Sequence, residues 1–68
     1  MRHFMMDCYY RSSPDAQAVL RESLEIVAPA PSIAIEEAHR RAQRLCPNYF
    51  ELRDLSRPDG LFYNSEVD

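Results

Sequence analysis

Two histidines and two cysteines are the side chains of this sequence best able to bind a metal or to carry out catalysis. They are His3, Cys8, His39 and Cys46. A tetrahedral zinc site needs its ligands to converge on one point. On a strand, however, His3 and Cys8 point to opposite faces, because an odd number of positions separates them. On a helix, His39 and Cys46 lie about 10 Å apart along the axis, so we expect no metal ion and no cofactor.

The same residues provide no complete catalytic arrangement. Cys8 and His39 are a nucleophile and a base by type, but the sequence supplies no third group that would orient them. A chain of 68 residues also has little volume for a substrate pocket unless two copies share one. We therefore expect that the protein is not an enzyme. A small enzyme with a site shared between subunits is kept as an alternative.

A run of basic residues, AHRRAQR, occupies positions 38–44. Its Arg40, Arg41 and Arg44 are able to contact the phosphates of a nucleic acid or an acidic protein. Glu36 and Glu37 precede two of these arginines by four positions, which is the favourable order for ion pairs within a helix. The run is therefore more typical of a solvated helix face, and its arginines form an alternative basic surface. Together with aromatic residues on a sheet, they would suit a single-stranded nucleic acid.

The composition indicates one small domain over residues 1–68, with a thin core. Eleven acidic residues against eight arginines give a net charge of −3. This balance disfavours nucleic acid as a partner, because nonspecific binding depends on neutralising cations. No segment has the length of a membrane span or the apolar region of a signal peptide. We therefore expect a cytoplasmic protein whose two cysteines are free thiols.

The basic residues other than histidine are all arginine. This bias is associated with GC-rich genomes, and we expect a bacterial or phage origin. In size and charge alone, the chain resembles small phage inhibitors such as anti-CRISPR proteins, which act by occupying a partner's surface. The resemblance implies an inhibitor-like protein and assigns no site residue.

Alternating side chains predict a first strand over residues 2–11. Met5 and Tyr9 lie on one face of this strand. The opposite face carries Phe4, Met6, Cys8 and Tyr10. Both faces of the strand are therefore expected to make apolar contacts.

Two helices are expected to follow. Ser12-Ser13-Pro14-Asp15 is typical of a helix start, and apolar residues at helical spacing extend this helix to about residue 27. Ala28-Pro29-Ala30-Pro31 ends it, because proline lacks the N–H that a helix requires. Ser32 is expected to cap a second helix, which Pro47 ends. The first helix is expected to bury Val19, Leu20 and Leu24, and the second Ile35, Ala38, Ala42 and Leu45.

The last third of the chain predicts a β-hairpin with strands over 49–55 and 61–67, joined by a turn at Arg57-Pro58-Asp59-Gly60. Pairing Ser56 with Leu61 places five apolar residues on one face, whereas a shift by one residue divides the set. These five are Phe50, Leu52, Leu61, Tyr63 and Val67. Tyr49, Leu55 and Phe62 then face outward.

These elements predict an α+β fold of order β-α-α-β-β, in which two helices pack on one face of a three-stranded, mainly antiparallel sheet. The other face is then apolar and uncovered. Contiguous exposed apolar area is uncommon on monomers and typical of interfaces. We therefore expect a non-enzymatic protein-interaction module that binds a protein partner or itself through this face. The candidate contact residues are Tyr9, Tyr49, Phe62, Met5, Leu55, Arg53 and Arg11.

Overall fold

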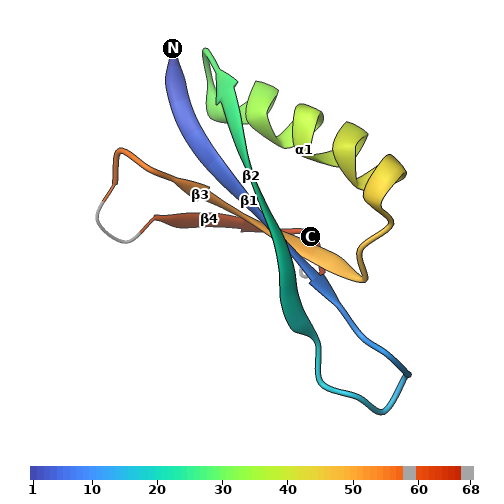
Figure 1. The fold of residues 1–68 in the computed structure, drawn as a ribbon. Helices are drawn as coiled ribbons and strands as arrows, with labels where there is room; N and C mark the ends of the chain where they lie inside the picture. The colour runs from blue at the N-terminus through green and yellow to red at the C-terminus, as the bar shows by residue number, and fades with distance from the viewer. Residues whose placement is uncertain (58–59, 67–68) are drawn as a thin grey trace.

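The computed structural model describes residues 1–57 and 60–66 and shows a four-stranded sheet with a helix on one of its faces (Figure 1). The strands lie in the order β2-β1-β3-β4, and each neighbouring pair is antiparallel. The elements are β1 (Arg2–Tyr10), β2 (Val19–Ala28), α1 (Pro31–Leu45), β3 (Tyr49–Asp54) and β4 (Leu61–Asn64). The described part of the chain is thus an α+β fold of order β-β-α-β-β.

The expected order β-α-α-β-β is wrong, because the segment predicted as the first helix is the strand β2. This strand pairs with β1 from Arg2 opposite Ala28 to Tyr10 opposite Val19, with one irregularity at which Arg21 has no partner in β1. The sequence around Ser13 that resembled a helix cap forms the turn between the two strands, where Ala16 N donates to Ser13 O at 3.1 Å. The β1–β2 hairpin extends past the end of α1 in Figure 1.

The alternation of apolar side chains in β2 is typical of a strand with one covered face, and these side chains are Leu24, Ile26 and Ala28. They alternate with Ser23, Glu25 and Val27, and they face α1 together with the buried residues of β1. The apolar positions of this segment fit a helical period as well, so local spacing did not decide between the two. Pairing with β1 makes this segment a strand. The backbone N–H and C=O groups along both edges of β1 need hydrogen-bond partners once the strand is buried, and this segment supplies them on one edge. Val19 and Leu20, expected to be buried, are about half exposed near the hairpin end.

The helix predicted before Pro47 is confirmed as α1. Pro31 occupies its first turn, where the missing N–H costs nothing. Ala30 is the N-cap residue in place of the expected Ser32, and no side chain caps the helix start. The helix ends at Cys46, which adopts a left-handed conformation with φ 53° and donates its N–H to Ala42 O at 2.8 Å.

The core lies between α1 and the sheet face that it covers. The fully buried apolar residues are Phe4, Met6, Cys8, Ile26, Ala28, Ala34, Ala38, Phe50 and Leu52. Ile35, Ala42 and Leu45 of the predicted helical stripe are partly buried against this core. The two alanines at its centre allow the helix backbone to approach the sheet closely.

The β3–β4 pairing differs from the expected register. Arg53 lies opposite Leu61 and Leu52 lies opposite Tyr63, so Phe62 is an extra residue at a β-bulge. The predicted pairing of Ser56 with Leu61 is therefore wrong, and the connection is longer than a four-residue turn. Leu61 falls on the face away from α1 and is 49% exposed. Pro58, Asp59 and Val67, which belonged to the predicted turn and strand, lie outside the described residues.

Asp54 explains the longer connection. This residue follows Phe50 and Leu52 on the covered face and is only 2% exposed. Its carboxylate accepts hydrogen bonds from Ser56 N at 3.0 Å and Ser56 Oγ at 2.7 Å, and it also binds the Arg2 guanidinium. These bonds hold the chain in a turn directly after β3. They also lower the pKa of the Asp54 carboxyl, with the Ser56 hydroxyl as the largest cause.

Leu52→Ala tests the packing of β3. Leu52 is fully buried, so we expect a loss of about 2–5 kcal/mol in the free energy of unfolding. Leu61→Ala is the matched control, because the half-exposed Leu61 should change stability by no more than about 0.5 kcal/mol. Urea denaturation measures both values. Equal effects would contradict the observed register.

Asp54→Asn tests the carboxylate turn. The folded-state pKa of Asp54 is lowered, so its ionised form stabilises the fold at pH values above the unfolded pKa of about 3.9. This contribution is lost as the pH falls from that value through the folded pKa. We therefore expect the variant to be less stable than the wild type at pH 7 and the difference to shrink at acidic pH. Thermal midpoints measured from pH 7 to 2 check this, with Asp15→Asn as the control; a pH-independent difference would refute it.

Candidate binding surface on the outer sheet face

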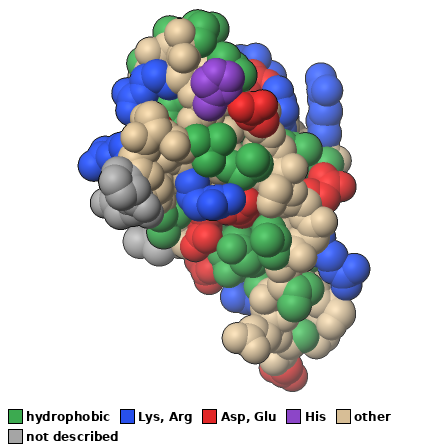
Figure 2. Space-filling view, turned by 60° about the vertical axis from the view of Figure 1, so that its left-hand side comes forward, with side chains coloured by type: hydrophobic (Ala, Val, Ile, Leu, Met, Phe, Trp, Pro, Cys, Tyr) green, Lys and Arg blue, Asp and Glu red, His purple; other side chains and the backbone are tan. Residues whose placement is uncertain are grey.

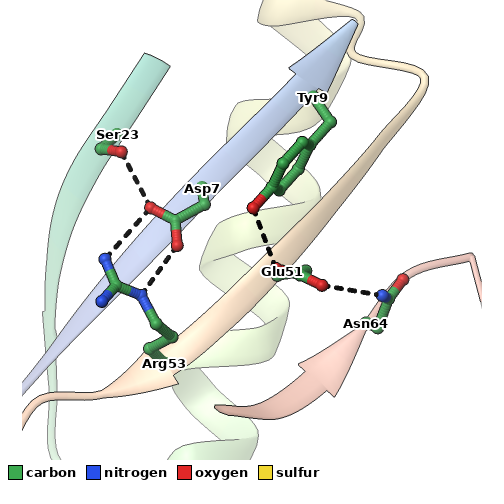
Figure 3. A network of polar contacts seen from close by, with 6 residues as sticks. All are labelled: Asp7, Tyr9, Ser23, Glu51, Arg53 and Asn64. Carbon is green, nitrogen blue, oxygen red and sulfur yellow. Dashed lines mark hydrogen bonds and ion pairs between the residues drawn. The ribbon is translucent and has the colours of Figure 1, made fainter. Parts of the chain in front are cut away.

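The sheet face opposite α1, called here the outer face, is the main surface that the fold leaves uncovered. Figure 3 shows its polar side chains in front of the strands, with the helix behind. Cross-strand partners share a face, so the registers define its members. They are His3, Met5, Asp7, Tyr9, Leu20, Ser23, Glu25, Val27, Tyr49, Glu51, Arg53, Leu61 and Asn64.

A hydrogen-bonded ion pair occupies the centre of the outer face (Figure 3). Arg53 Nε donates to Asp7 Oδ2 at 2.7 Å, and Arg53 Nη2 donates to Asp7 Oδ1 at 3.3 Å. Ser23 Oγ also donates to Asp7 Oδ1, at 2.8 Å. Asp7 is 4% exposed, whereas 45% of the Arg53 side chain remains in contact with solvent. The carboxylate therefore holds the guanidinium in one orientation while part of it stays accessible.

A second group of contacts lies beside the first and fixes two aromatic rings. The rings of Tyr9 and Tyr49 stack at 4.8 Å with an interplanar angle of 8°. Tyr9 donates its hydroxyl to Glu51 Oε1 at 3.1 Å, and Asn64 Nδ2 donates to Glu51 Oε2 at 3.2 Å. Burial, followed by the hydrogen bond to Glu51, raises the pKa of the Tyr9 phenol. The stacked pair is therefore a preordered aromatic surface on the sheet.

Aliphatic side chains accompany these polar contacts. On the outer face Leu20, Val27 and Leu61 are about half exposed, as is Leu55 directly after β3. Met5 is half-buried between Glu25 and Arg53 in the cross-strand row. In the view of Figure 2, hydrophobic side chains form separate groups with acidic and basic side chains between them. The side of the molecule seen in this view thus combines apolar and charged groups rather than forming one continuous apolar patch.

Four of the predicted contact residues belong to the outer face, namely Met5, Tyr9, Tyr49 and Arg53, and Leu55 follows the end of β3. Phe62 lies elsewhere. Its ring centroid is 5.6 Å from that of Phe4, and it packs against the core, because the β-bulge turns it away from the outer face. Arg11 lies beyond the end of β1, where its backbone N–H donates to Asn48 Oδ1 at 2.7 Å.

Sequence reasoning placed Glu51, Arg53 and Asn64 on this side of the sheet but missed the role of Asp7 and Ser23 in holding Arg53. The alternation of β1 placed Asp7 between Met5 and Tyr9 on the outward side, which was the available signal. Ser23, which completes the contacts of Asp7, had been assigned to a helix, so its proximity was not predictable from local spacing.

The predicted basic surface lies on α1, on the other side of the sheet. A groove of about 290 Å³ runs between this helix and β2. Its lining is Leu24, Glu37, Arg40, Arg41, Arg44 and Leu45. Arg40 and Arg41 both bind Glu37 at 3.0 Å, and the Arg41 hydrogen bond lowers the pKa of the Glu37 carboxyl. Arg41 Nη1 also donates to Glu25 O of β2 at 3.4 Å.

The two thiols lie in different environments. Cys8 is buried in the core, and this burial raises the pKa of its thiol. Cys46 is exposed at the end of α1. Among residues 1–57 and 60–66, no three His, Cys, Asp or Glu side chains are grouped so that they could hold a metal ion.

Compared with known proteins, the chain matches no family model, no curated protein and no solved structure. Within the described ranges, α1 is too short and too polar to span a bilayer.

A double-mutant cycle tests the central ion pair. Arg53→Met and Asp7→Asn each remove one partner, and we expect a coupling free energy of about 1–2 kcal/mol, because Asp7 is buried and receives two bonds from Arg53. The exposed pair Arg40–Glu37 is the control cycle and should show only about 0.3–0.5 kcal/mol. Chemical denaturation of the single and double variants gives both couplings. Coupling as small in the first cycle as in the second would mean that Arg53 is not fixed by Asp7.

Proposed function

We propose that this protein is a non-enzymatic binding module that contacts a protein, either a different chain or a second copy, through the outer face. The observation that carries the proposal is the stacked pair Tyr9–Tyr49 beside an arginine that Asp7 holds in place. Tyrosine and arginine are the residue types on which binding energy at interfaces concentrates. An inhibitor that occupies a partner's surface, as the small phage proteins of similar size and charge do, is one form of such a module.

Preorganisation supports this function. Ordering a flexible side chain at an interface costs roughly 0.5–1.5 kcal/mol. Arg53 and Tyr9 are already ordered by bonds to Asp7 and Glu51, so they would lose little further freedom on binding. Fully burying one of the half-exposed aliphatic side chains would add a favourable contribution of at most about 1.5–3 kcal/mol. A small number of contact residues on the outer face can therefore be enough for a useful binding affinity.

The charges of the outer face indicate the chemistry of the partner. Among the described outer-face residues of β1 and its two partner strands, Asp7, Glu25 and Glu51 carry carboxylates and Arg53 carries a guanidinium, so negative charge is in excess. Asp7 is bound by the Arg53 guanidinium, whereas the carboxylates of Glu25 and Glu51 bind His3, Tyr9 and Asn64 and form no ion pair with an arginine in the described part of the chain. A partner surface with apolar side chains bordered by lysine or arginine would complement this arrangement.

The single-stranded nucleic acid alternative is less well supported. It requires the tyrosines and the helix arginines to contact one ligand. Tyr9 and Tyr49 lie on the outer face, whereas Arg40, Arg41 and Arg44 lie on α1 on the other side of the sheet. The carboxylates around the tyrosines would also repel phosphate groups.

A pair of double variants tests the proposal. Tyr49→Ala with Leu55→Ala removes exposed contact area from the outer-face side of the sheet, and Arg40→Ala with Arg41→Ala removes charge from α1. We expect the first to weaken binding to a purified partner at least about tenfold, while the second changes it little. The partner is obtained by photo-crosslinking from position 49 in cells and is then purified, so that affinity is measured with defined components.

The crosslinking itself includes a control, because the same photoreactive residue at position 40 should not capture that partner. Circular dichroism establishes that each variant keeps its fold. If the arginine variant loses binding and the tyrosine variant does not, α1 is the contact surface and the proposal is wrong.

A further inference from the structure

The strand β2 presents a long edge that pairs with no other described strand. It lies at the end of the strand order β2-β1-β3-β4, so only one of its sides is hydrogen-bonded to β1. It contains ten residues, whereas β4 at the opposite edge contains four. An unpaired edge of this length is a template for the addition of another strand.

The charges along β2 select one way of pairing it with itself. In an antiparallel pair related by a two-fold axis, the residue at the centre faces its own copy. Centring the pair on Glu22 or Glu25 would place identical charges opposite each other, which is unfavourable. Centring it on Ser23 places Arg21 opposite Glu25 twice, once on each side of the axis. A centre at Leu24 avoids repulsion but forms no ion pair, so the Ser23 register is favoured.

The residues required for this pairing are accessible. Arg21 is the extra residue at the irregularity opposite Cys8 and Tyr9, so it is not part of the β1 ladder. Within residues 1–57 and 60–66, Arg21, Glu22 and Arg44 form no ion pair.

The groove between α1 and β2 complements a second β2 strand. Glu22 shares the covered face of the sheet with Leu24, since it lies opposite Cys8. In the Ser23 register, Glu22 of the second copy lies opposite Leu24, which lines the groove together with Arg44. The acidic side chain of each copy thus meets the basic groove of the other. Arg41 donates to the edge at Glu25 O over 3.4 Å, a long bond that a strand N–H at about 2.9 Å would replace.

We propose that two copies of this chain form a two-fold dimer in which the β2 strands pair antiparallel about Ser23. Two four-stranded sheets would then join into one continuous sheet. A two-fold axis perpendicular to that sheet places both helices on one side and both outer faces on the other. The dimer uses other residues than the outer-face tyrosines, so it goes beyond the proposed binding function, and either can fail without the other.

Charge reversal tests the dimer and its register together. Sedimentation equilibrium should show that the wild type approaches twice the mass of one chain as the concentration rises. Arg21→Glu and Glu25→Arg should each raise the dimer dissociation constant at least about tenfold, because two attractive pairs become repulsive. The double variant with both changes should recover dimerisation. A mixture of the two single variants should form a heterodimer, in which both pairs are again of opposite charge.

Two controls separate an effect on the β2 pairing from a general effect of charge and from the loss of other Glu25 contacts. Glu36→Arg makes the same charge change at an exposed position of α1 outside the groove and should leave the mass unchanged. Because Glu25 also binds His3 at 2.7 Å, a second measurement is independent of substitution. Amide hydrogen exchange over residues 21–25 of the wild type should slow as the protein dimerises.

Three outcomes would overturn the proposal. The first is the mass of a single chain at every concentration. The second is a dimer that neither reversal weakens or that the double variant does not restore. The third is a dimer that Tyr49→Ala abolishes while both reversals leave it intact, since the copies would then meet through the outer face.

Discussion

The antiparallel pairing of β1 with both β2 and β3 is the interaction on which the rest of the structure depends. It makes β1 an interior strand of the sheet, flanked by β2 and β3, and buries its Phe4, Met6 and Cys8 completely. The same pairing brings Ser23 and Arg53, which are far apart in the sequence, to either side of Asp7. Both the core and the outer face therefore follow from the neighbours of one strand.

The two faces of β1 are stabilised in different ways, by apolar packing under α1 and by hydrogen bonds to a buried carboxylate on the outer face. Beneath α1 the residues are apolar, and the alanines of the helix allow close packing without polar groups to satisfy. On the outer face Asp7 is almost as buried as the core, and burial of a carboxylate is costly unless it is hydrogen-bonded. Its bonds to Arg53 and Ser23 meet that requirement. The result is a rigid polar centre among exposed aliphatic side chains, which suits recognition of another protein surface.

The helix covers only part of what a sheet of this size exposes. It leaves the outer face uncovered, and it leaves the β2 edge open beside an arginine-lined groove. A small domain gains little stability from its own core, so burial of further surface by association would contribute substantially. Association along the edge would also place two outer faces side by side, and a partner with two matching sites would then bind more tightly than a single face allows.

Local patterns in the sequence were sufficient for several elements. The alternation of residues 2–11 predicted β1, the prolines bounding residues 32–46 predicted α1, and the aromatic residues after Pro47 predicted β3, because each of these signals is local. The outward side of Met5, Tyr9 and Tyr49 followed from the same alternation. Tertiary structure alone decided the segment 19–28, whose apolar spacing fits a helix and a strand equally well.

What settled that segment was the need of β1 for a second hydrogen-bonding partner, which involves residues distant from it in sequence. The position of Phe62 and the contacts of Asp7 likewise depend on residues of other strands, so local patterns could not predict them. A β-bulge rotated Phe62 into the core, and the partners of Asp7 come from two other strands. A one-residue shift reverses every face beyond it. The sequence by itself therefore determined which stretches are extended or helical where one period dominates, whereas cross-strand pairing decided the strand order, the register and the chemistry of the outer face.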